Sequence, residues 1–526
     1  MSWWKIVLLT IAGLAVAGVM YGYYQYKYAE LDPYVPMFSD NCASCHGSDL
    51  RGSEKGTALV DNRLEGGDSV AALVQSINHG NPDAGMPAYA GELTELQIKG
   101  LAIYIAERRL GQRFTDFRWE KEIVIPVDPV QTEFHEFVIE VFVDNLDPMP
   151  FSIEPLPDGS FLLTEKKRGL SIISADGVQS DVIEGTPDTA SYSLDMRGVQ
   201  YGVGWLLDVA AHPDYEENGW IYLHYTDLCA EWCKSQGKES VFPMSMNRLD
   251  RGRIKDGQWV DVETLWQADV EAYTFAPDSG AGGRIAFDGN GHVFIGVGMK
   301  SPYGPQDLNS PFGKIHRITD DGKIPPDNPF VVRANESPDN IPFTRQTTWT
   351  FGHRSPQGLE WNDLRGRVWN AEMGPRGGDE INELLPGRNY GWPFHSLGLE
   401  YTGFKVERHK AIDVEFDDDV VEQTLVDITP SPAISSFAFY KGDRFSHWKD
   451  NLLLGSLKGS SLFRYVFDGN KLIHKETLIK DLGRIRDVEI GYDGLVYLLL
   501  ENKAGSQIVR LVPTDNMDGK ETVSIQ

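Results

Sequence analysis

From residue 135 onward, the sequence repeats one pattern that restricts the folds open to it: a tight turn followed by a short apolar segment. Such turns occur at Asp158-Gly159, Asn290-Gly291 and Asp493-Gly494, each before an apolar run. Asp-Gly and Asn-Gly favour the turns that connect antiparallel strands. No long amphipathic helical pattern interrupts them, so the sequence predicts an all-β array over residues 135–515.

A recurring hairpin over one continuous region is typical of propeller blades, which close the array and leave few exposed edges. Six blades would contain about 60 residues each, a length that allows functional loops. A large sandwich or two separate β-domains is the alternative, but no linker splits the region. We therefore predict a six-bladed propeller over residues 135–515 and a C-terminal tail over residues 516–526.

The motif Cys42-Ala43-Ser44-Cys45-His46 predicts covalent attachment of haem c. Two thiols spaced three apart can bond the two vinyl groups of haem, and the adjacent histidine then ligates the iron. Half of a zinc site or a redox CxxC pair is the alternative. Zinc would need two more ligands nearby, and a redox pair would not need the histidine. We therefore expect Cys42 and Cys45 to hold the haem and His46 to be an axial ligand.

The second axial ligand is expected in a loop some tens of residues later. Met86 lies in a Gly-Met-Pro turn, after apolar residues that follow helical spacing over residues 70–77. An isolated methionine is usually a core residue, but this turn follows a haem motif, so we predict that Met86 ligates the iron. His79 is the rival ligand, although it ends a helix directly before the Gly80-Asn81-Pro82 break.

A capping box, Thr94-x-x-Gln97, starts another predicted helix after this turn. Residues 31–110 therefore resemble a small, all-α class I cytochrome c domain. Residues 111–134 have mixed charge, two prolines and no sustained helical period, so they are interpreted as a linker.

Residues 1–30 resemble a targeting or anchoring segment. Lys5 precedes an uncharged, almost wholly apolar run over residues 6–22, and aromatic residues flank it on both sides. The flanking aromatics favour an uncleaved membrane helix; a signal peptide cleaved near Ala15-Val16-Ala17 is the alternative. Both interpretations place the rest of the chain on the periplasmic side of a bacterial inner membrane, anchored or secreted.

The charge of the chain limits its partners. It has 49 Lys and Arg against 77 Asp and Glu, a formal charge of −28, which repels phosphate backbones and excludes nucleic-acid binding. The two remaining cysteines, Cys229 and Cys233, are expected to close a small disulfide loop between blades, as exported proteins permit. Metal binding is the alternative, with His224 nearby.

The large region resembles the soluble glucose and aldose sugar dehydrogenases, six-bladed propellers that bind pyrroloquinoline quinone (PQQ). The resemblance spans most of residues 135–515, in the order of the family's motifs. The matching segments are LLDVAAHPDY from Leu206, GGRIAFDGNG from Gly282, GHRSPQGLEW from Gly352, EMGPRGGDEIN from Glu372 and GRNYGWP from Gly387.

This resemblance implies a cluster of cations that binds the carboxylates of PQQ. Its members are Arg354, Lys458, Arg484 and Arg486. Surface arginines paired with carboxylates such as Asp481 and Asp487 are the alternative interpretation of the last two.

The resemblance also implies two calcium ions. One would be bound by the backbone carbonyls of Gly374 and Pro375 and would polarise the quinone; a structural ion would lie near Glu380 and Tyr390. The implied reaction is oxidation of an aldose at its anomeric hydroxyl. Arg354 would stabilise the negative charge that develops on the cofactor.

Three positions depart from the family pattern. The histidine that serves the family as a base corresponds to Gly280, which cannot take a proton, so Asp278 becomes the tentative base. Ser355 replaces an asparagine, and the glutamine that precedes the LLDV strand is displaced around Trp205. Gln306 is expected to contact the sugar.

Two functions follow from these observations. The first is a PQQ-dependent dehydrogenase of an aldose sugar or related alcohol that passes electrons to haem c, and then to a cytochrome or a respiratory oxidase. The second is a propeller that has lost catalysis and serves as a binding module attached to an electron-transfer cytochrome. The haem domain favours the first, because a passive module has no use for an electron exit.

Overall fold

The computed structural model describes residues 32–113, 116–189, 194–196, 199–240, 242–301, 303–331, 341–406 and 420–514. The expected membrane helix over residues 1–30 and the expected tail over residues 516–526 both lie outside these ranges. Among the helices that the structure describes, none combines the length and the apolar character needed to cross a bilayer. By its contacts the chain forms two compact units, Met1–Asp116 with Gly398–Lys405, and Phe117–Leu397 with Val406–Gln526.

The first unit is a small helical domain, as expected for a cytochrome c. Its helices are α2 (Tyr34–Asn41), α3 (Ala43–His46), α4 (Val70–His79), η1 (Pro82–Ala84) and α5 (Glu95–Arg109). The predicted capping box is confirmed: the Gln97 backbone N–H donates to Thr94 Oγ1 (3.3 Å), and the Thr94 N–H donates to Gln97 Oε1 (2.8 Å). These bonds satisfy donors that the first turn of α5 would otherwise leave open.

Helices α2 and α5 pack closely because position 100 is a glycine. A Cβ atom there would lie 1.8 Å from Cζ of Tyr34. Phe38 and Tyr104 continue this contact with ring centroids 5.6 Å apart. A segment remote in sequence completes the core, since Leu399 is 1% exposed and belongs to the same apolar cluster. The Tyr34 hydroxyl also donates to the Gly403 carbonyl at 2.8 Å.

The second unit is a six-bladed propeller, which confirms the predicted fold class. The first blade contains β3 (Pro150–Pro155), β4 (Phe161–Glu165) and β5 (Gly169–Ile173). The second contains β8 (Leu206–Ala211), β9 (Ile221–Leu228), β10 (Ser245–Lys255) and β11 (Gln258–Gln267). The third contains β12 (Gly282–Phe287), β13 (His292–Val297), β14 (Lys314–Thr319) and β15 (Thr348–Phe351).

The remaining blades continue in chain order. The fourth contains β16 (Pro356–Asn362), β17 (Arg367–Glu372), β18 (Asp379–Glu383) and β19 (Val426–Ile428). The fifth contains β20 (Ile434–Phe439), β21 (Leu452–Ser456), β22 (Leu462–Asp468) and β23 (Lys471–Ile479). The sixth contains β24 (Arg484–Ile490), β25 (Val496–Glu501), β26 (Ser506–Pro513), β2 (Glu136–Leu146) and β1 (Val130–Gln131).

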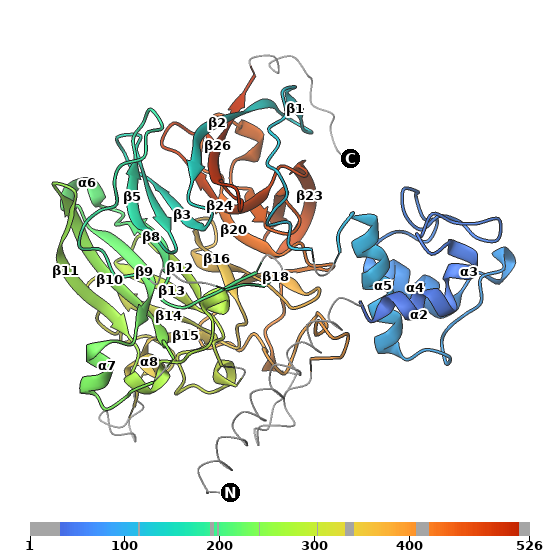
Figure 1. The fold of residues 1–526 in the computed structure, drawn as a ribbon, viewed down its shortest axis with the longest axis horizontal. Helices are drawn as coiled ribbons and strands as arrows, with labels where there is room; N and C mark the ends of the chain where they lie inside the picture. The colour runs from blue at the N-terminus through green and yellow to red at the C-terminus, as the bar shows by residue number, and fades with distance from the viewer. Residues whose placement is uncertain are drawn as a thin grey trace, which may run out of the picture. The chain divides into compact units, whose positions relative to one another are not determined.

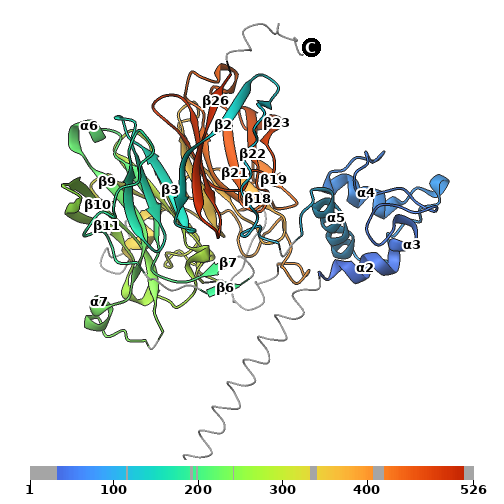
Figure 2. The ribbon, with the colours of Figure 1, turned by 45° about the horizontal axis from the view of Figure 1, so that its top comes forward.

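The ring closes through strands from both ends of the propeller sequence. Strand β2 pairs antiparallel with β26, with Ile139 opposite Leu511 and Val141 opposite Val509, and the two strands lie side by side in Figures 1 and 2. The first strands of the six blades (β3, β8, β12, β16, β20, β24) contact one another around the centre. A strand whose blade packs between two neighbouring blades is buried on both faces. This explains the continuous apolar run in β25.

The disulfide between Cys229 and Cys233 is confirmed, with an S–S distance of 2.06 Å. Its expected position between blades is wrong. The loop that it closes holds α7 (Glu231–Ser235) and connects β9 to β10, two neighbouring strands of the second blade.

Candidate cofactor sites

The haem motif lies where α2 ends and α3 begins, with neither Cys42 nor Cys45 in a disulfide. His46 follows directly, and its Nδ1 donates to the Thr57 carbonyl at 2.8 Å. A hydrogen bond at Nδ1 fixes the ring and leaves Nε2 for a metal, which is how ligating histidines are commonly oriented. Gly56 packs against Cys45, where a Cβ would come within 2.9 Å. These residues fit a covalently attached haem.

Met86 lies in a short loop that is held by backbone hydrogen bonds to Asn81 and by close packing against Gly80. Its backbone exchanges two hydrogen bonds with Asn81, at 2.9 and 3.0 Å. Gly80 ends α4 against the same loop, since a Cβ there would lie 2.5 Å from the Pro87 carbonyl carbon. The rival His79 directs Nδ1 to the Gln75 carbonyl of its own helix at 3.0 Å. Met86 as the second iron ligand stays a prediction that this loop geometry favours.

One face of the propeller gathers the other predicted site residues. In each blade the second strand runs antiparallel to the first, so the start of the first strand and the end of the second lie at the same face. Arg354 precedes β16, and Arg484 begins β24. The loops that follow second strands lie at this face too. Gly374 and Pro375 follow β17, Lys458 follows β21, and Gln306 lies in the connection between β13 and β14.

Arg354 is half-buried and positioned by several neighbours. Its Nη1 donates to the carbonyls of Met373 (2.9 Å) and Gly374 (3.1 Å), and its guanidinium lies 5.3 Å from the ring centroid of Trp392. Its Nε is buried with no hydrogen-bond partner among the described atoms. Glu372 accepts from the Arg354 backbone N–H at 3.1 Å. The guanidinium therefore keeps a donor for a ligand while its backbone is fixed.

Gln306 belongs to the same neighbourhood. Its Nε2 donates to the carbonyl of Trp392 at 2.7 Å, and its amide exchanges hydrogen bonds with Asn389. A cavity of about 660 Å³ opens beside it, with Tyr303, Asp307 and Asn309 among its lining residues. A substrate role for Gln306 stays a prediction.

Arg484 and Arg486 share one carboxylate that the sequence did not indicate. Glu501, at the end of β25, accepts from Nε and Nη2 of Arg484 (2.8 and 2.6 Å) and from Nε of Arg486 (2.7 Å). The two guanidinium groups hold the pKa of Glu501 far below its usual range despite its burial. Asp481, an alternative partner in the sequence, pairs instead with Arg118 and Lys121.

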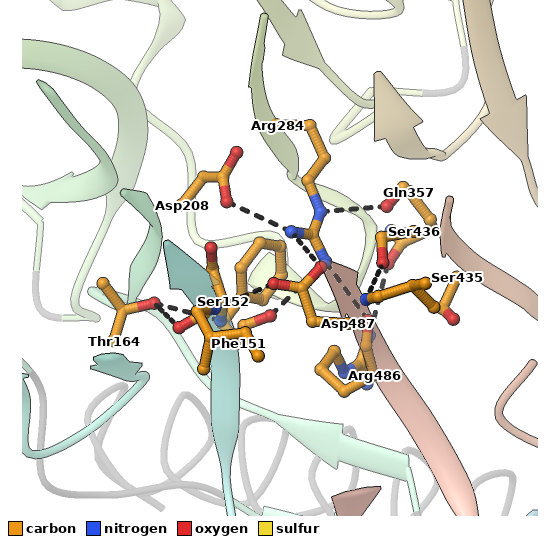
Figure 3. Close-up of polar contacts among 12 residues, drawn as sticks. Phe151, Ser152, Thr164, Asp208, Arg284, Gln357, Ser435, Ser436, Arg486 and Asp487 are labelled. Carbon is orange, nitrogen blue, oxygen red and sulfur yellow. Dashed lines mark hydrogen bonds and ion pairs between the residues drawn. The ribbon is translucent and has the colours of Figure 1, made fainter. Parts of the chain in front are cut away.

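Arg284 links the first strands of several blades near the centre of the propeller, as Figure 3 shows. Its guanidinium forms ion pairs with Asp208 (3.1 Å) and Asp487 (2.8 Å). It also donates to the backbone carbonyls of Gln357 (3.0 Å) and Arg486 (3.2 Å). These partners come from β8, β24 and β16, so one side chain joins the first strands of several blades and fixes the positions from which the site residues extend.

Asp278 is placed in a buried network that does not favour the role of base. Its two oxygens accept from four donors: Lys300 Nζ (2.6 Å), Ser245 Oγ (2.8 Å), the Gly204 N–H (2.7 Å) and Thr226 Oγ1 (2.5 Å). Its side chain is 0% exposed. A carboxylate that is fully bonded and ion-paired has no site left for the proton of a substrate hydroxyl.

The two calcium positions remain predictions. The Gly374 carbonyl, an expected ligand, accepts from Arg354, while its N–H donates to Asp379 at 3.0 Å. At the second position, burial and the neighbouring Glu372 carboxylate raise the pKa of Glu380 well above its usual range. The Tyr390 hydroxyl donates to the Glu383 carbonyl (2.6 Å), so only its backbone oxygen suits an ion.

Comparison with known proteins gives a consistent result for both units. The family model described as Glucose / Sorbosone dehydrogenase matches residues 147–510. The model described as Cytochrome C oxidase, cbb3-type, subunit III matches residues 30–105. The chain is 33% identical over 380 residues to aldose sugar dehydrogenase YliI of Escherichia coli, covering 71% of this chain and 92% of that protein.

Further relatives support the same division. Quinoprotein glucose dehydrogenase B of Acinetobacter calcoaceticus is 25% identical over 450 residues, covering 73% of this chain and 89% of that protein. The crystal structure of the soluble aldose sugar dehydrogenase from Escherichia coli superposes with a TM-score of 0.60 at 31% identity, covering 72% of this chain and 100% of that one. Cytochrome c6 of Leptolyngbya boryana is 35% identical over 77 residues, covering 14% of this chain and 85% of that protein.

Proposed function

Since this chain belongs to the glucose and sorbosone dehydrogenase family and carries a cytochrome c domain, we propose that it is a quinohaemoprotein dehydrogenase. It oxidises an aldose at the anomeric hydroxyl, or a related alcohol, with PQQ in the propeller, and passes the electrons to haem c. The observation that carries this proposal is the presence, in one chain, of a family propeller and an oriented haem motif.

The residues present fit a polyanionic cofactor. The face of the propeller that holds Arg354 and Arg484 also holds Lys458, so cations from three blades lie there in a chain of charge −28. The Arg354 Nε donor lies buried without an acceptor, as expected where a ligand supplies one. A quinoprotein relative supports the choice of PQQ. PQQ, when bound, supplies a quinone that accepts the hydride from the sugar.

The chain's own residues bind and orient in this proposal. Arg354, held by Glu372 and stacked on Trp392, presents its guanidinium to the cofactor and stabilises negative charge there. Gln306 positions the sugar, and Gly374 and Pro375 contribute carbonyls to calcium. Gly280 cannot accept the hydroxyl proton, and Asp278 is fully bonded. The proton must therefore pass to another group.

The attached cytochrome gives the electrons an intramolecular exit. Oxidation of an aldose releases two electrons and two protons, and haem accepts one electron at a time. A covalently linked acceptor raises its effective concentration at the donor site. We place the enzyme on the periplasmic side of a bacterial inner membrane, held by its N-terminal segment, with a cytochrome or a respiratory oxidase as the next acceptor.

Haem absorbance provides the direct test of this function. The full-length chain would be loaded with PQQ and Ca²⁺ and mixed with aldoses and simple alcohols. Haem reduction is expected only with PQQ and a suitable substrate. Arg354→Met should slow it by about 10²- to 10³-fold, the usual effect of losing a group that stabilises developing charge. Arg367→Met, at an exposed arginine of β17, is the matched control.

The same experiment discriminates the alternative function. If the chain binds PQQ but no substrate reduces the haem, the propeller is a binding module attached to a cytochrome. If haem reduction by a sugar proceeds without PQQ, the cofactor assignment is wrong.

A further inference from the structure

Lys166 is a buried amine that forms no ion pair with the residues that the structure describes. It follows β4 directly and is 7% exposed. Within the described part of the chain its Nζ forms neither a hydrogen bond nor an ion pair. Two aromatic rings hold it instead, with the Nζ 5.6 Å from the centroid of Phe151 and 5.2 Å from that of Trp205. Lysine is almost never buried without a partner, so its position requires an explanation.

The surroundings of Lys166 are strongly cationic. The guanidinium groups of Arg284 and Arg486 lie 4.7 and 5.9 Å from the same Phe151 ring, and Figure 3 shows them near it. Each of these arginines has its own carboxylate, Asp208 with Asp487 for Arg284 and Glu501 for Arg486. Among these three cations, Lys166 is the one that forms no ion pair in the described part of the chain, although the Glu501 carboxylate is near enough to stabilise its charge.

A second unsatisfied donor lies beside it. The indole of Trp205 is 2% exposed, and its Nε1–H has no hydrogen-bond partner among the described atoms. Buried N–H groups nearly always have an acceptor. Two neighbouring donors without acceptors, one of them cationic, indicate a ligand that brings negatively charged oxygen.

We propose that Lys166 binds an anionic oxygen of the cofactor, which adds a fifth cation to the four that the family resemblance assigns. This inference rests on the proposed function. The position of Lys166 supports this inference. The end of β4, which Lys166 follows, lies at the same face of the propeller as Arg484, the first residue of β24. PQQ carries three carboxylates, so its negatively charged oxygens can be shared among several cations on this face.

The charge state of Lys166 gives this binding a characteristic pH dependence. Burial, reinforced by Arg486, Arg484 and Arg284 and opposed by Glu501, lowers the pKa of Lys166 to about 7. Above that pH the free amine is neutral. An anion bound beside it favours the ammonium form, so binding takes up a proton and the affinity falls as the pH rises from 7 to 9.

The experiment measures PQQ binding rather than turnover. Dissociation constants would be determined for the full-length chain with Ca²⁺ at pH 6.5, 7.5 and 8.5, by equilibrium dialysis. Lys166→Met should weaken binding about 10- to 100-fold at pH 6.5, as for loss of a charge-assisted hydrogen bond. The dissociation constant of PQQ for Lys166→Met should also change less with pH than that of the wild type. Lys166→Arg, charged at all three pH values, should bind within a few-fold of the wild type without that added slope.

Stability separates this role from a structural one. Removing a buried cation that has no partner relieves a desolvation cost. Lys166→Met should therefore melt at or above the temperature of the wild type. Lys449→Met, at an exposed lysine, is the matched control and should change neither property.

Each result has one meaning. If the wild type and Lys166→Met bind PQQ equally well, with the same pH dependence, the inference is overturned while the proposed function stands. If the wild-type chain takes up no PQQ, the proposed function fails first and the inference falls with it.

Discussion

Several buried charges in this propeller have a specific partner of opposite charge. Arg284 lies between Asp208 and Asp487, Glu501 bonds Arg484 and Arg486, and Asp278 pairs with Lys300. Such pairs contribute little net stability, because desolvation offsets their attraction, but breaking one leaves a buried charge alone. Single substitutions at these buried ion pairs should therefore have large and specific effects.

The Asp278–Lys300 pair provides a clear case. Asp278→Asn should lower the free energy of unfolding by about 3 to 5 kcal/mol, since it leaves the Lys300 ammonium buried without a carboxylate. Urea unfolding followed by circular dichroism measures this. The double variant Asp278→Asn with Lys300→Met should recover part of the loss, because neither charge then remains. A Asp278→Asn variant that folds normally but cannot oxidise sugar would contradict this structural role and restore Asp278 as the base.

Elements in this chain differ in how local their determinants are. Helix α5 begins at a capping box four residues long, and blades begin at Asp-Gly turns, so these features could be predicted from the sequence. The haem motif is local for the same reason. The disulfide was predictable as a pair, but not its place inside a blade, because the pairing of β9 with β10 joins residues that are 17 or more positions apart.

Contacts between distant segments could not be predicted. Glu501 is the last residue of the apolar strand β25, and nothing near it in sequence indicates that it would bond two arginines on the neighbouring strand β24. Lys166 likewise carries no local signal, since its environment comes from Phe151, Trp205 and β24. The resemblance to a family identified the arginines as a group, but their shared carboxylate required three-dimensional geometry.

The segment Gly398–Lys405 contributes a core residue to the helical unit, from which it is remote in sequence. Leu399 is 1% exposed in the core of the helical unit. Leu399→Ala should lower the unfolding free energy of that unit by about 2 to 5 kcal/mol, the usual cost of a large-to-small core change. Denaturant titration followed by haem absorbance would detect it. Leu364→Ala, at a leucine that is 72% exposed, is the control and should have no effect. Equal behaviour of the two variants would exclude Leu399 from the core.

At the scale of the whole molecule, closure of the propeller depends on residues outside the matched family region. That region begins at residue 147, whereas β2 (Glu136–Leu146) precedes it and pairs with β26. The linker also contributes, because Trp119 is 6% exposed in a cluster with Phe151 and Trp205. The part of the predicted linker that begins at Phe117 therefore belongs to the propeller unit.

Truncation tests this dependence. A chain starting at residue 117 should fold into a stable propeller, since it keeps β2 and the Trp119 contacts. A chain starting at residue 147 exposes the unpaired edge of β26 and should melt at a markedly lower temperature or aggregate. Thermal unfolding and size-exclusion chromatography compare them. Identical melting of the two truncated chains would show that β2 is dispensable.

The participation of Leu399 in the haem unit also has a consequence for biosynthesis. Cys42, Cys45 and His46 are made early, but a residue that completes the core around them is made more than 350 positions later. Because synthesis proceeds from the N-terminus, the helices of this unit are complete before Leu399 is made, and its core stays open on one side until that residue is available.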